Sequence, residues 1–226
     1  MKRTAAAAEP AAVPRKPRGR PRSFDRDAAL DAAMQVFWEK GYESTSISDL
    51  TEVMGINPPS LYAAFGDKER LFMEAIERYA QARGSSCPYC DEPTARAAIE
   101  KLLTYMATEL TESRHPRGCL MMMAATTASN TSPQLQKALA DMRTGSRDRM
   151  KERIKHGIAD GDVPAGTDAG ALADFYSTVM TGMSMQARDG ASRKSLLGTV
   201  ERAMSIFPPV PKGATKARKR REAEAA

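Results

Sequence analysis

The sequence predicts an all-α fold in which an N-terminal three-helix domain with a helix-turn-helix is joined by a long fourth helix to a larger helical domain. Apolar residues recur at steps of three and four, while strand-like alternation is nearly absent. Aromatic residues make up only 6% of the chain and methionine occurs 14 times, a composition that favours helices over sheets. Glycine and proline separate the periodic segments, and 226 residues can bury a sizeable core.

Basic residues cluster at both ends of the chain, outside the helical pattern. Residues 1–22 combine alanine and proline with several arginines and lysines, and they have too little apolar surface to offset the entropy of ordering. We predict a disordered basic arm there and a disordered basic tail over residues 208–226. The formal net charge of +6 favours a polyanionic partner, with nucleic acid before a membrane surface.

The first domain is predicted over residues 23–66. Gly41 ends its first helix, and Ser46 caps the second together with Asp49, in a short-acid version of the capping box. The residues expected to face inward are Leu30, Ala33, Met34, Phe37 and Trp38 in the first helix, Ile47, Leu50, Val53 and Met54 in the second, and Leu61 and Phe65 in the third.

The stretch VMGINPPSLYAAF predicts a tight turn between the second and third helices. Gly55 can adopt the left-handed conformation that ends a helix, and Asn57 is a natural N-cap. Two prolines then fall on the first helical positions, where no backbone N–H is needed. Such a helix-turn-helix can place its second helix in a DNA major groove about 12 Å wide. The alternative, a helical hairpin packed inside a bundle, leaves Ser60 and Tyr62 unexplained.

The second domain is predicted over residues 67–207, beginning with a linking helix over 67–83 that Asp67 caps. Its further helices are expected at about 94–113, 117–128, 133–159, 168–188 and 192–206, separated by proline and glycine. No apolar run approaches the roughly 18 residues of a transmembrane helix. Three cysteines are too few for a disulfide framework, so we expect a cytoplasmic protein with no membrane partner.

The run from Arg26 to Phe72, with AAMQVFWEKGYESTSISDL followed by MGINPPSLYAAFGDKERLF, closely resembles the DNA-binding domain of TetR-type transcriptional regulators. The resemblance implies a homodimer that binds double-stranded DNA at an inverted-repeat operator and is released by a small effector, most often as a repressor. The sequence has no phosphate-binding loop or nucleophile motif, so we expect a protein that is not an enzyme. Beyond residue 90 the resemblance extends only to helix number and length.

The DNA contacts are expected from the basic arm and from the helix-turn-helix. The resemblance implies phosphate contacts for Thr45, Ser46 and Tyr62 and a groove-facing role for Pro59, Ser60 and Ala63. Lys68 matches the lysine at the head of the family's fourth helix, whereas Ala64 departs from the larger residue often found at its position. The arm has a plainer alternative as a solubilising tail. The complete expected set is Arg18, Arg20, Arg22, Thr45, Ser46, Asn57, Pro59, Ser60, Tyr62, Ala63 and Lys68.

The second domain is expected to bind the effector and to form the dimer. Flexible methionines suit an adaptable pocket for a small hydrophobic or aromatic ligand, although they are also ordinary core residues. The pocket residues expected are Tyr105, Met106, Leu110, Cys119, Met122, Met123 and Phe175. The dimer residues expected are Phe175, Val179, Met183, Leu196, Val200 and Met204, with the monomer core as the alternative use of these stripes.

Other classes of function have weaker support. Cys87 and Cys90 have the spacing of a thiol or zinc pair, and Cys119 opens a helix, so a thiol- or electrophile-sensing regulator is an alternative. A closed zinc site needs further ligands, and only two histidines are present. We therefore expect no metal, cofactor or catalytic site. A non-specific basic DNA-binding protein is the remaining rival, and salt-sensitive binding to any DNA would distinguish it.

Overall fold

A computed structural model describes residues 24–84, 91–127 and 131–210, and within these ranges the chain forms nine α-helices and no strand. None of these helices has the length and apolar character needed to cross a membrane. They are α1 (Arg26–Lys40), α2 (Ile47–Met54), α3 (Pro58–Phe65), α4 (Lys68–Gly84), α5 (Ala95–Glu109), α6 (Leu120–Thr127), α7 (Pro133–Asp160), α8 (Ala169–Arg188) and α9 (Arg193–Met204).

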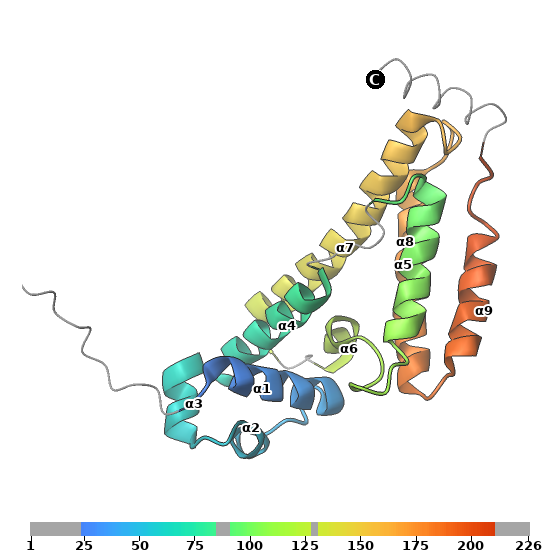
Figure 1. Ribbon diagram of the computed structural model, residues 1–226. Helices are drawn as coiled ribbons and strands as arrows, with labels where there is room; N and C mark the ends of the chain where they lie inside the picture. The colour runs from blue at the N-terminus through green and yellow to red at the C-terminus, as the bar shows by residue number, and fades with distance from the viewer. Residues whose placement is uncertain (1–23, 85–90, 128–130, 211–226) are drawn as a thin grey trace, which may run out of the picture.

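Helices α1, α2 and α3 gather at one end of the molecule, and α4 leads away from them toward the second group of helices (Figure 1). Helix α1 packs mainly on α4 and α2, while α7 packs on α8 and α5 packs on α9. The short α6 lies between the two groups, in contact with α4, α7 and α8 and also with α1. The buried apolar side chains form one cluster that includes residues of both groups.

Local capping explains where α2 and α3 begin and end. Ser46 Oγ accepts from the Asp49 backbone N–H at 3.0 Å, and Asp49 Oδ2 accepts from the Ser46 N–H at 2.8 Å, which completes the predicted capping box. Gly55 has φ 64° and ψ 31°, the left-handed conformation that ends α2. Asn57 Oδ1 accepts from the Ser60 N–H at 2.9 Å and starts α3. The predicted helix-turn-helix is confirmed.

The inward faces of these helices follow the expected periodicity with three exceptions. Leu50, Leu61 and Phe65 are buried. Val53, which was expected to face inward, is 48% exposed, and Met34 and Ile47 are only half-buried against the core. Val53 lies one position before the buried Met54, and a step of one residue turns a side chain about 100° around a helix. The prediction for Val53 was therefore wrong.

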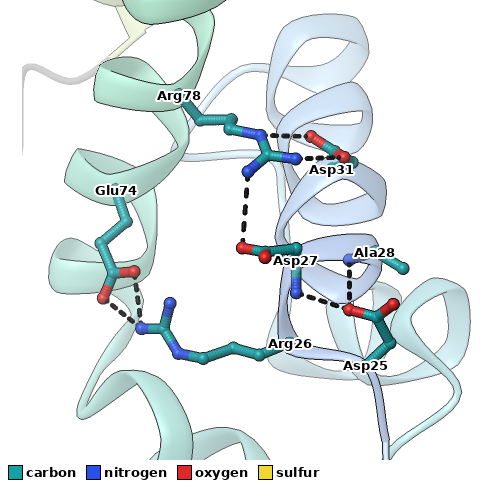
Figure 2. A network of polar contacts seen from close by, with 7 residues as sticks. All are labelled: Asp25, Arg26, Asp27, Ala28, Asp31, Glu74 and Arg78. Carbon is teal, nitrogen blue, oxygen red and sulfur yellow. Dashed lines mark hydrogen bonds and ion pairs between the residues drawn. The ribbon is translucent and has the colours of Figure 1, made fainter.

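Ion pairs between charged side chains join α1 to α4 (Figure 2). Arg78 of α4 pairs with Asp31 of α1 through two hydrogen bonds, of 2.9 Å from Nε and 2.8 Å from Nη2, in a bidentate arrangement. Its Nη1 lies 3.4 Å from Asp27 Oδ1. Closer to the start of both helices, Arg26 Nη2 lies 2.6 Å from Glu74 Oε2. These pairs join α1 to α4, which connects the two helix groups.

The helix boundaries of the second group differ most from prediction between α5 and α6. Helix α5 ends at Glu109 rather than near residue 113, and α6 begins at Leu120 rather than near residue 117. The connection contains Pro116 and also Gly118, whose φ of 84° favours glycine. Gly157 of α7 is needed for packing, because a Cβ there would lie 2.6 Å from Ala95 Cβ at the start of α5.

Candidate functional site

The outer face of α3 is left uncovered by the rest of the described chain. On its inner side, Leu61 and Phe65 pack into the core, with side chains that are 0% and 3% exposed. Pro59, Tyr62 and Ala63 are exposed on the opposite side, and Tyr62 is 49% exposed despite its large ring. Ser60 and Ala64 are half-buried, and Asn57 is exposed. The helix therefore presents a surface of small side chains and one phenol, which lets another molecule approach its backbone closely.

The start of α2 lies beside this surface in the chain, and one predicted contact there was wrong. Ser46 is exposed, as a phosphate contact requires. Thr45 is 1% exposed, and its hydroxyl donates to the Gly41 carbonyl oxygen at 2.6 Å. That side chain holds the turn between α1 and α2 and is not available to a phosphate. Sequence reasoning could not separate Thr45 from Ser46, because both are hydroxyl residues at a helix start.

Lys68, at the first position of α4, is held by an aromatic ring rather than by a carboxylate. Its Nζ lies 4.3 Å from the centroid of the Tyr42 ring. Partial burial lowers the pKa of Lys68, and burial raises the pKa of Tyr42 to about 12, so the phenol stays neutral beneath the ammonium. No ion pair of Lys68 is found within the described part of the chain, so its charge is available to an external anion.

The charge of the helix-turn-helix region itself opposes DNA binding. Residues 24–84 contain six arginines and lysines but eleven aspartates and glutamates, a formal charge of −5. Residues 1–22 contain seven arginines and lysines and a single glutamate. Arg18, Arg20 and Arg22 lie outside the described residues. A polyanion would therefore be attracted by positive charge outside residues 24–84, such as that of residues 1–22, and by single positions such as Lys68.

A cavity of about 180 Å³ lies in the second group of helices, with walls from α4, α5, α6, α7 and α8. Five of the predicted pocket residues line it, namely Tyr105, Met106, Leu110, Cys119 and Met122. Met123 and Phe175 do not line it, so these two predictions were wrong. Phe175 lies two residues before the lining Ser177, a turn of about 200° around α8, and its side chain is 38% exposed. Met123 is likewise one step around α6 from Met122.

The cavity also has a polar part that the sequence did not reveal. Glu109 of α5 and Arg143 and Arg149 of α7 are among the lining residues, with hydroxyls from Ser146, Ser177 and Thr181. Arg143 Nη1 is buried and has no hydrogen-bond partner among the described residues. In the sequence these arginines belong to a strongly charged helix, which is normally a solvated face. Only the packing of α7 brings them to a cavity.

Of the three cysteines, only Cys119 lies within the described residues. Cys119 is 4% exposed, lines the cavity, and its backbone N–H donates to Ser184 Oγ at 2.9 Å. The predicted pair Cys87 and Cys90 lies outside the described residues. Within the described ranges, no group of three or more histidine, cysteine, aspartate or glutamate side chains is placed to hold a metal ion.

Most of the predicted dimer residues belong to the core of the chain itself. Met183, Leu196, Val200 and Met204 are between 0% and 4% exposed and cannot reach a partner, so these four predictions were wrong and the alternative, the monomer core, holds for them. The outer surface of α8 has different apolar residues. Phe175 and Met185 are 38% and 42% exposed, Val179 is half-buried, and Gly182 is exposed with open space before it.

The end of α1 is attached to the cavity wall. Trp38 Nε1 donates to the Gly118 carbonyl oxygen at 3.1 Å, and Gly118 directly precedes the lining residue Cys119. The Trp38 ring stacks on His115 at 4.5 Å and meets Tyr79, another lining residue, edge-on at 5.0 Å. Arg188 of α8 donates to the Trp38 carbonyl oxygen at 3.0 Å and also to that of Glu39.

Comparison with known proteins identifies both helix groups. Residues 29–75 match the family model for bacterial regulatory proteins of the tetR family, and residues 93–201 match the tetracyclin repressor-like C-terminal domain. The chain is 35% identical over 197 residues to the HTH-type transcriptional repressor ComR of Escherichia coli (strain K12), covering 86% of this chain and 94% of ComR. It is 29% identical to the repressor BdcR of the same strain, covering 82% and 90%.

A solved structure is also similar to this chain. It is a cysteine mutant of the TetR family transcriptional regulator CifR in complex with 26-bp double-strand operator DNA. The match has a TM-score of 0.80 and 46% sequence identity, and it covers 84% of this chain and 100% of that chain.

Proposed function

This chain belongs to the TetR family of transcriptional regulators, and we propose that it acts in the cytoplasm as a homodimeric repressor that leaves an inverted-repeat operator when a small molecule fills the cavity. The observation that carries the proposal is the uncovered face of α3, where Tyr62 is 49% exposed above a fully buried Leu61. A surface of this kind has no role in the fold of the chain. It matches the shape needed to enter a major groove.

The proposed DNA contacts are of two kinds, those to base edges and those to phosphates. Pro59, Ser60 and Ala63 face the groove, where they offer one hydroxyl and several apolar contacts. With so few base-edge hydrogen bonds, part of the sequence preference would come from thymine methyl groups and from DNA shape. Ser46, Tyr62 and Lys68 are the proposed phosphate contacts, together with Arg18, Arg20 and Arg22 of the arm. Asn57 acts by capping α3 and thereby positioning it.

Two recognition helices must be held at a fixed spacing to read two half-sites. We place the dimer contact on the outer surface of α8, formed by Phe175, Val179, Gly182 and Met185, whose spacing of four, three and three residues keeps them on one face. Gly182 lets the backbones approach closely. A Gly182→Glu variant should become monomeric by light scattering and lose operator binding, while the exposed Gly198→Glu on α9 serves as the matched control. A dimer that survives Gly182→Glu would refute this placement.

Effector binding would reach DNA through α4 and the end of α1. The cavity is lined by Tyr79 of α4 and by residues next to Gly118, and both positions contact Trp38. A ligand that shifts these walls would alter the separation of the two α3 helices in the dimer. Coupling of about 1 to 3 kcal/mol corresponds to a reduction in DNA affinity of roughly 5- to 150-fold.

The test is selection from a pool of genomic DNA fragments with the purified full chain at about 0.15 M salt. We expect recovery of one inverted repeat, bound about 10³-fold or more tightly than unrelated DNA. The matched control is Ala63→Glu, which places a carboxylate on the exposed face of α3 and should abolish the selection without unfolding the chain. Uniform retention of all fragments would instead support the non-specific basic DNA-binding protein.

A second candidate function is thiol or electrophile sensing, favoured by the position of Cys119 on the cavity wall. A small electrophile that enters the cavity would reach this thiol, and the added group would occupy ligand space. In that case N-ethylmaleimide should release the operator from a Cys87→Ser, Cys90→Ser variant, but not after Cys119→Ser is added. Release that persists without Cys119 would exclude this second function.

A further inference from the structure

Arg143 of α7 is an unsatisfied cation at the cavity. Its Nη1 is buried without a hydrogen-bond partner, and no ion pair to Arg143 is found in the described part of the chain. Desolvation by burial lowers the pKa of Arg143. A buried donor without a partner is costly, and those that persist in native proteins usually meet water, an ion or a ligand.

Three other basic side chains of α7 have carboxylate partners. Lys137 pairs with Asp141 at 2.5 Å, Arg147 pairs with Asp148 and Asp174, and Lys155 pairs with Glu152 at 2.8 Å. Carboxylates are therefore plentiful around this helix, yet none is directed to Arg143. Arg149 also has no ion pair among the described residues, but it is exposed to solvent, whereas Arg143 has a buried nitrogen without a partner there.

The cavity wall does not supply the anion either. Glu109 is the single acidic residue among the described lining residues, and its carboxylate lies 2.7 Å from Arg114 and 3.9 Å from His115. Arg149 adds a second positive charge to the wall. The lining thus has two guanidinium groups and one carboxylate that is already paired, which leaves an excess of positive charge for a ligand to balance.

The residues around Arg143 form an arrangement suited to a carboxylate. Ser146 follows it by three residues and Met150 by seven, so all three lie on the cavity face of α7. A guanidinium fork binds a carboxylate with two parallel hydrogen bonds, and a serine hydroxyl can add a third. Met106, Leu110 and Met122 line other parts of the cavity and would contact an apolar body.

We propose that the cavity binds a small amphipathic carboxylic acid, with its carboxylate on Arg143 and its apolar or aromatic body against Met106, Leu110 and Met122. This inference rests on the proposed function, in which the same cavity is the effector site, and it names the chemical class of the effector. The volume of about 180 Å³ is below the roughly 300–1,000 Å³ of sites for drug-sized ligands, so the acid has a single ring or a short chain.

The test compares acids with neutral amides of the same shape. Benzoate, phenylacetate and hexanoate, and the three corresponding amides, are titrated calorimetrically into the full chain at neutral pH without DNA. We expect at least one acid to bind about tenfold or more tightly than its amide, because the amide cannot form the charge-assisted hydrogen bond. Equal affinities within every pair, or no binding of any acid, would overturn the proposal.

Substitutions test whether Arg143 causes the preference for acids over amides. Arg143→Met keeps an apolar stem and should bring the ratio of acid to amide affinity close to one, while amide binding persists and shows that the cavity is intact. Arg143→Gln gives the same answer if the methionine variant does not fold. Lys155→Met removes a charge from the exposed side of α7 and should leave the ratio unchanged. An unchanged ratio in both Arg143 variants would overturn the assignment.

Thermal unfolding separates a ligand-binding role from a structural one. Because Arg143 has a buried nitrogen without a partner among the described residues, Arg143→Met should unfold at the same temperature as the unmodified protein or at a higher one. If Arg143 instead stabilised the fold, its replacement would lower the unfolding temperature. A large drop in the unfolding temperature, with the acid preference retained in Arg143→Gln, would refute the inference.

A measurement of operator binding in the presence of each acid distinguishes this inference from the proposed function. If an acid binds through Arg143 and releases the operator, both are supported. If it binds through Arg143 while the operator stays bound, the ligand class stands and the role of the cavity as an effector site fails. If the protein selects an inverted repeat but no acid binds better than its amide, the regulator stands and the ligand class fails.

Discussion

The indole Nε1 of Trp38 donates a hydrogen bond to the backbone carbonyl oxygen of Gly118, 3.1 Å away and 80 residues later in the chain. Trp38 lies near the end of α1, which packs on α2 of the helix-turn-helix, and Gly118 lies next to the cavity residue Cys119. This bond therefore joins the DNA-binding helices directly to the wall of the cavity. It offers the proposed coupling between the two sites a physical route that a substitution can interrupt.

Trp38→Phe removes this donor but keeps an aromatic ring for the contacts with His115 and Tyr79. We expect unfolding in urea to show a decrease in stability of about 1 to 3 kcal/mol, because the Gly118 carbonyl oxygen is left without its buried partner. The variant should also release DNA less completely when the effector is added. Full retention of both stability and ligand response would show that this bond does not link the two sites.

Tyr62→Phe removes a hydroxyl from the exposed face of α3 without changing the packing of that helix. If the hydroxyl binds a phosphate, operator affinity measured by fluorescence anisotropy should fall about 3- to 10-fold. The decrease should be similar for all sequences, since phosphates carry no base identity. Urea unfolding should be unchanged because the side chain is 49% exposed. Reduced stability with unaltered affinity would give the tyrosine a structural role instead.

Deletion of residues 2–22 removes seven basic residues from a chain whose helix-turn-helix region has a formal charge of −5. Operator binding should weaken strongly at low salt. The plot of log affinity against log salt concentration should become shallower by about 0.9 for each phosphate that the arm neutralises in the full chain. The unfolding midpoint of the remaining chain serves as the control and should not move. An unchanged salt dependence would identify the arm as a solubilising segment.

The stability that Asp49 gives to the helix-turn-helix should be lost in acid. Its hydrogen bond with Lys40, at 2.6 Å, and its bonds with Ser46 hold the pKa of Asp49 well below its ordinary range. A depressed pKa in the folded state stabilises the protein above about pH 4, the value in the unfolded chain, and the contribution disappears as the pH falls below it.

Asp49→Asn should accordingly lower the thermal midpoint at pH 7, and its difference from the unmodified protein should shrink at pH 3. Glu52→Gln is the matched control, because Glu52 is an exposed carboxylate on the same helix without a described ion pair. A difference that stays constant between pH 7 and pH 3 would show that the capping box does not depend on the ionised carboxylate.

Local chemistry accounts for the features that the sequence predicted well. The end of α2 at Gly55, the cap at Asn57 and the capping box of Ser46 and Asp49 involve residues within a few positions of one another. Their geometry depends on backbone conformation and short-range hydrogen bonds, which residue type largely decides. The inner anchors Leu61 and Phe65 follow from the helical period for the same reason.

The sequence by itself determined the helical class, the turn of the helix-turn-helix and the resemblance to a DNA-binding domain. Tertiary structure alone decided that Thr45 is buried, that Met183 and Leu196 serve the core rather than a partner, and that Arg143 meets the cavity with an unpaired nitrogen. Periodicity reveals which side of a helix is apolar, but a buried apolar stripe can face its own chain or another copy. A charged helix face becomes a binding site only when other helices enclose it, because burial depends on distant residues that no local pattern contains.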